Sequence, residues 1–122
     1  MPSKLVHFEI PAEDTARARE FWGSLFGHEY RSWDGPVEYH MFEGEPGGGL
    51  YPAQAGERGL IVYFGTDDIR ASIARVRELG GTVDGDAEPI PGIGWYARCV
   101  DTEGNPFSLF QSDESVPAPD EG

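Results

Sequence analysis

The chain is 122 residues long, which suits one domain, and its 39% hydrophobic residues allow a packed core. Nine basic residues stand against 22 acidic ones, and the resulting net charge of −13 disfavours nucleic acid and anionic membrane surfaces as partners. The single cysteine excludes an intramolecular disulfide and a zinc site made of cysteines. The sequence has no long apolar run and no signal-peptide core, so we expect a soluble cytoplasmic protein.

The first half of the chain predicts a strand, a helix and three shorter strands. The apolar segment 5–10 is typical of a strand, and residues 13–27 are typical of a helix that begins near Asp14 and ends at Gly27. The helix carries one apolar stripe at helical spacing, formed by Ala18, Phe21, Trp22 and Leu25. The strand-like pieces that follow, separated by turns, are 29–33, 37–42 and 48–52.

The second half repeats this pattern at an offset of 54 residues. It begins with a strand at 60–65 and a helix at 67–81, in which Asp68 takes the place of Asp14. The apolar stripe of this second helix is formed by Ile69, Ile73, Val76 and Leu79. The strands expected after it are 81–84, 94–100 and 106–111. This half is slightly longer than the first, and we expect the extra loop residues in GDAEPIPGIG, residues 85–94.

The repeat predicts an α+β fold made of two tandem βαβββ modules, at about residues 4–53 and 58–112. One module of about 55 residues buries too little apolar surface to be stable alone. Side by side, the modules are expected to form a curved sheet around a shared cup, with the helices outside, and such a cup suits a small molecule. We therefore expect a single domain over residues 1–112, followed by an acidic, flexible tail at 113–122.

Three segments, in this order and at the repeat spacing, carry a resemblance to a known family. They are VHFEIPAEDTARAREFW, VYFGTDDIRASIARVRELGG and VDTEGNPFSLFQ, the last of which is similar to a D-P-x-G-N-x-x-E-L signature. Over about residues 4–112 the chain resembles the glyoxalase/bleomycin-resistance/dioxygenase superfamily, the vicinal oxygen chelate fold. The resemblance implies no single activity, because members include glyoxalase I, extradiol dioxygenases, epimerases, fosfomycin-modifying transferases and metal-free proteins that sequester antibiotics. Members often associate, and sheet edges invite pairing, so we expect a homodimer.

The resemblance also implies where a metal would bind. In the metal enzymes, ligands come from the first and last strands of each module, and the corresponding positions here are His7, Gly49, Ile61 and Ser108. Only His7 is a good ligand, since glycine and isoleucine offer no side-chain donor and serine offers a neutral hydroxyl. We therefore predict no metal and no cofactor. A rearranged metal site is the alternative, with donors from Glu9, Glu38, His40 and Tyr63.

Strand alternation places His7 and Glu9 on one face of their strand, opposite three apolar residues. Two interpretations stay open for this pair. Either it binds or deprotonates a ligand, or His7 is a hydrogen-bonded part of the cup wall. Tyr63 aligns with Glu9 through the repeat and is expected to face inward as well.

Alternation also places Tyr96 and Arg98 on one face of their strand, with Cys99 on the other as a structural thiol. The geometry of the family would turn Tyr96 and Arg98 toward the cup, where the Arg98 guanidinium clamps an anionic group of a ligand. The alternative for Arg98 is an ion pair with Glu9 or Glu38 and no role in binding.

The predicted function is binding of a small organic molecule by a glyoxalase/bleomycin-resistance-like protein without a metal. Trp95 and Phe110 are expected in the aromatic wall of the site. The predicted ligand-binding residues are His7, Glu9, His40, Tyr63, Tyr96, Arg98, Ser108 and Phe110. One alternative is an enzyme of the same superfamily, a lyase, isomerase or dioxygenase that uses His7 and Glu9 as acid and base or a rearranged metal site. Another is a non-catalytic interaction protein.

Overall fold

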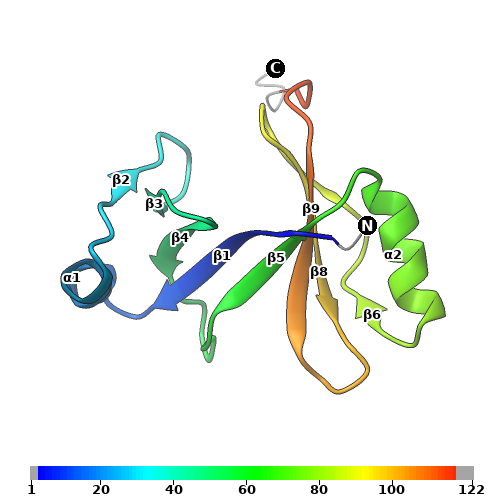
Figure 1. The fold of residues 1–122 in the computed structure, drawn as a ribbon, viewed down its shortest axis with the longest axis horizontal. Coiled ribbons are helices and arrows are strands. Elements are labelled where there is room, and N and C mark those ends of the chain that lie inside the picture. Colours follow the sequence, from blue (N-terminus) through cyan, green and yellow to red (C-terminus); the bar gives the residue numbers. More distant parts are fainter. Residues whose placement is uncertain (1–2, 118–122) are drawn as a thin grey trace. The chain divides into compact units, whose positions relative to one another are not determined.

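The computed structural model describes residues 3–117, which divide into two compact units. The N-terminal unit comprises residues 6–62, and the C-terminal unit comprises residues 63–117 together with residues 3–5. Each unit contains a mixed sheet and one helix (Figure 1). The α+β class and the repeated strand–helix–strand order predicted from the sequence are therefore confirmed.

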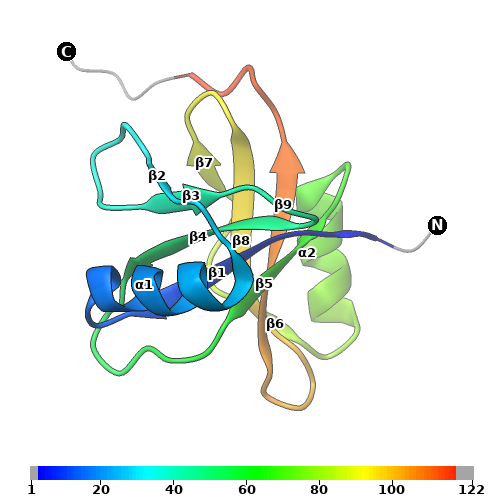
Figure 2. The same cartoon turned by 60° about the vertical axis from the view of Figure 1, so that its left-hand side comes forward.

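The N-terminal unit pairs its strands in an order that differs from their order in the chain. Its elements are β1 (Leu5–Ala12), α1 (Thr15–Phe26), β2 (Arg31–Ser32), β3 (His40–Phe42) and β4 (Gly47–Pro52). The sheet order is β2-β3-β4-β1, in which β1 and β4 are parallel and the other neighbours are antiparallel. α1 contacts this sheet at β4 (Figure 2).

Helix α1 begins and ends where the sequence predicted. The Asp14 carboxylate accepts a hydrogen bond from the backbone N–H of Arg17 at 2.9 Å, which satisfies a donor at the start of the helix. Gly27 follows the last turn with a φ of 76°, a left-handed conformation that glycine adopts without strain.

The apolar stripe predicted for α1 is only half covered. Ala18 and Trp22 pack on a core formed by Ile10, Phe42 and Leu50. In contrast, Phe21, Leu25 and Phe26 are exposed at 59%, 60% and 61%. The helix therefore uses a narrower face than the periodicity indicates, and an apolar edge of α1 is left accessible.

The C-terminal unit has a longer antiparallel pair at its centre. Its elements are β5 (Ile61–Gly65), which spans the unit boundary, α2 (Ile69–Glu78), β6 (Thr82–Val83), β7 (Glu88–Ile90), β8 (Gly94–Val100) and β9 (Pro106–Ser112). The sheet order is β5-β9-β8-β6, and β7 also pairs with β8. β5 and β9 are parallel, and the other pairs are antiparallel. β7 lies in the segment where only extra loop residues were expected.

Helix α2 covers one face of this second sheet. Its Ile69 and Ile73 are buried against Ala97, Cys99 and Leu109. Burial raises the pKa of the Cys99 thiol, which keeps it protonated and agrees with a structural role. No helix within residues 3–117 is long and apolar enough to cross a membrane.

Residues 113–117, the described part of the predicted tail, contact the C-terminal unit. The Asp113 carboxylate accepts a hydrogen bond from the Trp95 indole N–H at 3.2 Å. Val116 is buried, and its carbonyl accepts a hydrogen bond from the backbone N–H of Gly92 at 2.8 Å. Residues 118–122, to which the prediction of a flexible tail also applied, lie outside the described residues.

Candidate functional site

Three polar side chains of the N-terminal unit form a continuous hydrogen-bonded chain. His7 and Glu9 both come from β1, and Tyr39 reaches them from the residue before β3. The Tyr39 hydroxyl donates to the Glu9 carboxylate at 2.8 Å and lies 2.7 Å from Nε2 of His7. Because the tyrosine proton is directed to Glu9, its oxygen accepts from His7, and Nε2 of the imidazole carries the hydrogen.

Burial favours the neutral form of the His7 ring in this chain. Burial lowers the pKa of His7, and the nearby Glu9 carboxylate opposes that shift only in part. The bond to the Tyr39 oxygen requires a hydrogen on Nε2, and the neutral imidazole can carry its single hydrogen there. The His7 and Tyr39 rings also lie nearly parallel, with centroids 6.4 Å apart.

The Tyr39 ring fills the place that a side chain at Gly49 would take. A Cβ atom at Gly49 would overlap the Tyr39 ring and its hydroxyl, so only glycine fits beneath it. Tyr51 stacks on the same ring at 6.3 Å, and Trp33 meets it edge-on at 6.4 Å. Gly49 is the β4 position where the family resemblance implied a metal ligand, and here an aromatic ring occupies the space.

Tyr39 was not among the site residues predicted from the sequence. A signal was present, since Gly48 and Gly49 begin the strand predicted at 48–52 and Tyr39 lies in the strand predicted before it, at 37–42. Close approach of a large ring to a glycine backbone accounts for such a run. The pairing of β3 with β4 was needed to place the ring over Gly49.

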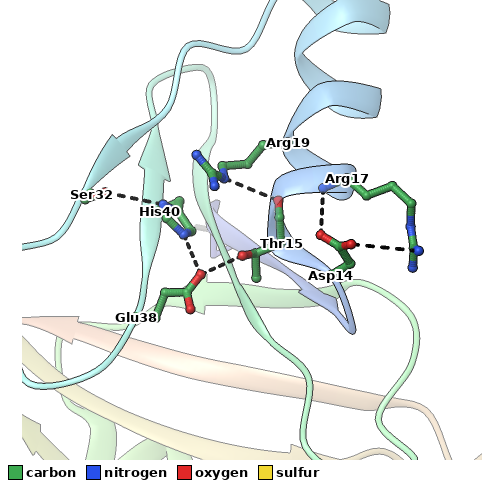
Figure 3. Close-up of polar contacts among 7 residues, drawn as sticks. All are labelled: Asp14, Thr15, Arg17, Arg19, Ser32, Glu38 and His40. Atoms are coloured by element: carbon green, nitrogen blue, oxygen red, sulfur yellow. Dashed lines mark hydrogen bonds and ion pairs between the residues drawn. The ribbon is translucent and has the colours of Figure 1, made fainter.

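His40 does not join His7 and Glu9, although it was predicted to bind ligand with them. It is 7% exposed and pairs across the strands with Leu50, a core residue on the α1 side of the sheet. Its Nε2 lies 2.8 Å from the Glu38 carboxylate, and its Nδ1 lies 3.4 Å from the Ser32 hydroxyl (Figure 3).

The Glu38 carboxylate connects this histidine to helix α1. It also accepts a hydrogen bond from the Thr15 hydroxyl at 2.6 Å (Figure 3). The bonds from Thr15 and His40 hold the pKa of Glu38 below its usual range. These contacts link the first turn of α1 to β3, which gives Glu38 and His40 a structural role.

In the C-terminal unit, three predicted site residues form a row across adjacent strands. Tyr63 of β5 is opposite Ser108 of β9, and Ser108 is opposite Arg98 of β8. Residues in register on neighbouring strands point to the same face, so the three side chains lie next to each other. The row is on the face away from α2, because Ala97 and Leu109 point to the helix.

The next row on this face is aromatic. Tyr96 of β8 is opposite Phe110 of β9, two residues along each strand from Arg98 and Ser108. Trp95 was expected in the same wall but belongs to the α2 side, where the Arg70 guanidinium lies 5.1 Å from its ring centroid. The face of the C-terminal sheet away from α2 therefore combines the polar row Tyr63–Ser108–Arg98 with the aromatic row Tyr96–Phe110. We call this face the site face.

The residues at the four implied metal positions do not fit a divalent metal. Gly49 and Ile61 have no donor, the Ser108 hydroxyl is neutral, and Nε2 of His7 carries a hydrogen directed to Tyr39. Within residues 3–117 no group of three or more His, Cys, Asp or Glu side chains is placed to hold a metal. The rearranged donor set considered from the sequence is not assembled either, since His40 and Glu38 lie on the α1 side.

An open hollow of about 610 Å³ lies beside His7 in the N-terminal unit. Its wall includes Arg31 of β2 and the turn that joins β3 to β4. The Arg31 guanidinium lies 3.8 Å from the Glu43 carboxylate, and both are exposed, so this pair holds the side chains weakly. His7 is therefore one of the residues that a small molecule in the hollow could reach.

Comparison with known families identifies the class of protein. A family model described as a glyoxalase-like domain matches residues 6–110, so the chain belongs to the glyoxalase-like domain family. The resemblance to the glyoxalase/bleomycin-resistance/dioxygenase superfamily is thereby confirmed. A search of curated proteins finds no match.

Solved structures with the same fold include proteins of different description. A hypothetical protein from Bacillus halodurans C-125 aligns with a TM-score of 0.72 and 19% identity over 97% of this chain and 100% of that chain. A methylmalonyl-CoA epimerase in complex with methylmalonyl-CoA and NH4+ aligns with a TM-score of 0.69 and 19% identity over 98% and 100%. Methylmalonyl-CoA epimerase from Mycobacterium tuberculosis aligns with a TM-score of 0.68 and 17% identity over 95% and 89%. Identities this low establish the fold and leave the activity open.

Proposed function

We propose that this glyoxalase-like protein binds a small organic molecule without a metal ion. The observation that carries the proposal is the position of Tyr39, whose ring fills the space above Gly49 and whose hydroxyl engages His7. A metal at this place would have to displace the ring and break two hydrogen bonds.

The chemistry of the C-terminal site face indicates what the ligand carries. Tyr96 and Phe110 offer aromatic surface, which gains free energy from stacking and desolvation. Arg98 offers a planar fork of donors that matches a carboxylate or phenolate. The net charge of −13 disfavours a highly charged anion, so the ligand has an aromatic or apolar body and one anionic group.

Metal analysis and ligand titration test this proposal together. Protein purified without chelator is expected to hold well under one equivalent of nickel, zinc, iron or manganese. Aromatic acids found by a tryptophan-fluorescence screen should bind equally well with and without EDTA. Stoichiometric metal that is lost in His7→Ala would overturn the proposal and favour a metal enzyme.

Two substitutions test the proposed anion contact. Arg98→Ala should weaken binding of a screened aromatic acid by about 1.5–3 kcal/mol, the usual worth of a hydrogen bond to a charged group. His7→Ala, a substitution in the N-terminal unit, serves as the comparison and should weaken binding less than Arg98→Ala does, since His7 supplies no guanidinium for the anion. Unchanged affinity in Arg98→Ala would assign Arg98 to a structural ion pair.

A second candidate function is acid–base catalysis by His7 and Glu9, favoured by the hydrogen-bonded chain that joins them through Tyr39. Removal of a proton from the carbon next to a thioester carbonyl is the chemistry to test, given the neighbours named as methylmalonyl-CoA epimerases. Wild-type protein in D2O would then incorporate deuterium into methylmalonyl-CoA, and His7→Ala would not. Equal incorporation with and without protein would exclude this candidate.

A further inference from the structure

The Ser108 hydroxyl is buried without a hydrogen bond. Its residue is 0% exposed, and its Oγ has no hydrogen-bond partner among residues 3–117. Such a group destabilises the folded protein, because water satisfies the hydroxyl in the unfolded chain. Proteins keep few unsatisfied buried polar groups, and each one requires an explanation.

The surroundings of Ser108 provide one. It is the middle residue of the row Tyr63–Ser108–Arg98, so an aromatic side chain flanks it on one side and a cation on the other. Tyr63 and Arg98 have interactions of their own, yet neither bonds to the Ser108 hydroxyl. The hydroxyl is therefore an unused donor and acceptor on a residue that is directly opposite Arg98 in the strand register.

We infer that Ser108 is a ligand-binding residue whose hydroxyl donates a hydrogen bond to the carboxylate of the bound molecule. This inference rests on the proposed function, because Arg98 holds the same carboxylate from the adjacent strand. Side chains directly opposite each other on paired strands have Cβ atoms about 5 Å apart, which lets both reach one carboxylate group. An acidic side chain at position 108 would repel that group, whereas a serine hydroxyl donates to it.

The neighbouring aromatic row narrows the ligand further. Tyr96 and Phe110 lie two residues along the strands from Arg98 and Ser108, which is roughly 6.7 Å. A carboxylate attached directly to a ring is too short to occupy both rows at once. The ligand class is therefore an aromatic acid with a short chain between the ring and the carboxylate.

Access to Ser108 requires movement of a neighbouring side chain, since the hydroxyl has no exposed surface. Of the two flanking residues Tyr63 is buried and Arg98 is exposed, so we assign the movement to Arg98, which exchanges its present interactions for the carboxylate of the ligand. Binding of the acid thus brings the guanidinium and the hydroxyl to the same group.

The experiment compares Ser108→Ala with Ser112→Ala, an exposed serine on the same strand and face. Thermal unfolding is measured without ligand, and 3-phenylpropionate and 3-phenylpropionamide are titrated into each protein. Ser108→Ala should unfold at the wild-type temperature or up to about 5 °C higher, because it removes an unsatisfied hydroxyl. It should bind 3-phenylpropionate about tenfold more weakly than wild type, and the amide should bind poorly to both. Ser112→Ala should match wild type in every measurement.

Either of two results would overturn the inference about Ser108 and leave the proposed function unaffected. A lower unfolding temperature for Ser108→Ala would mean that the hydroxyl is already satisfied in the folded protein, for example by a buried water molecule. Unchanged affinity of Ser108→Ala for 3-phenylpropionate would mean that the ligand does not use the hydroxyl, while leaving the proposed function in place. If wild-type protein binds no aromatic acid, the proposed function fails and the inference fails with it.

Discussion

Replacing Gly49 with alanine tests whether the Tyr39 ring occupies the ligand position of β4. An added Cβ overlaps the ring, which cannot retreat freely because it stacks on Tyr51 and its hydroxyl bonds both His7 and Glu9. Overpacking of this kind destabilises a protein by about 1–3 kcal/mol, and weakened hydrogen bonds add roughly 1 kcal/mol. We therefore expect Gly49→Ala to lower the free energy of unfolding by about 2–4 kcal/mol, and the Tm by roughly 6–15 °C.

A double-mutant cycle separates this overlap from a general effect of the substitution. In a Tyr39→Ala background the ring is absent, so Gly49→Ala should be neutral or stabilising by about 0.5–1 kcal/mol, since alanine is favoured over glycine in a strand. Urea unfolding of the four proteins gives the coupling energy between the two positions, which we expect to be at least about 2 kcal/mol. Additive effects, or a Gly49→Ala protein as stable as wild type, would refute the placement of the ring.

The contacts of His7, Glu38 and helix α1 can each be tested in solution. Because burial lowers the pKa of His7, this histidine binds a proton more readily in the unfolded chain than in the folded protein. The free energy of unfolding should therefore fall as the pH drops below the ordinary value of 6.5 toward the lowered pKa. His7→Asn should flatten this pH dependence, and a variant with the wild-type pH profile would contradict the prediction. Thr15→Val should raise the pKa of Glu38 in a carboxyl NMR titration, since the Thr15 hydrogen bond is the largest cause of the lowered pKa. An unchanged pKa in the variant would show that the Thr15 hydrogen bond is not the cause. The protein should sediment as a homodimer, because the exposed Phe21 edge of α1 adjoins a hollow lined by both Asp14 and Arg17, and this mixed charge suits a two-fold contact with a second copy. Phe21→Ser should then give the 13.4 kDa monomer, and a wild-type protein that is monomeric at micromolar concentration would disprove the dimer.

Features that depend on near neighbours along the chain could be predicted from the sequence. Strand alternation placed His7 with Glu9, which Tyr39 joins in the structure, and it separated Arg98 from Cys99. The helix starts were readable because an aspartate side chain caps the backbone a few residues on, as Asp14 does. The internal repeat supplied the order of elements, and with the family resemblance it was sufficient for the fold class.

Which face of a strand meets which partner depends on the packing of distant segments and could not be predicted from the sequence. Tyr39 and His40 are adjacent and must point to opposite sides, but alternation cannot say which one lies with His7. The pairing of His40 with Leu50 sends the histidine to the α1 core and leaves Tyr39 over Gly49.

The same limit applies to α1 and to the row around Ser108. Periodicity assigned Phe21 and Trp22 to one stripe, yet the rotation of the helix on its sheet buries only part of that stripe. The position of Ser108 was predicted, but the unsatisfied state of its hydroxyl was not. Strand register, helix rotation and hydrogen-bond satisfaction all depend on residues distant in the chain, because they follow from which surfaces pack together and not from local propensity.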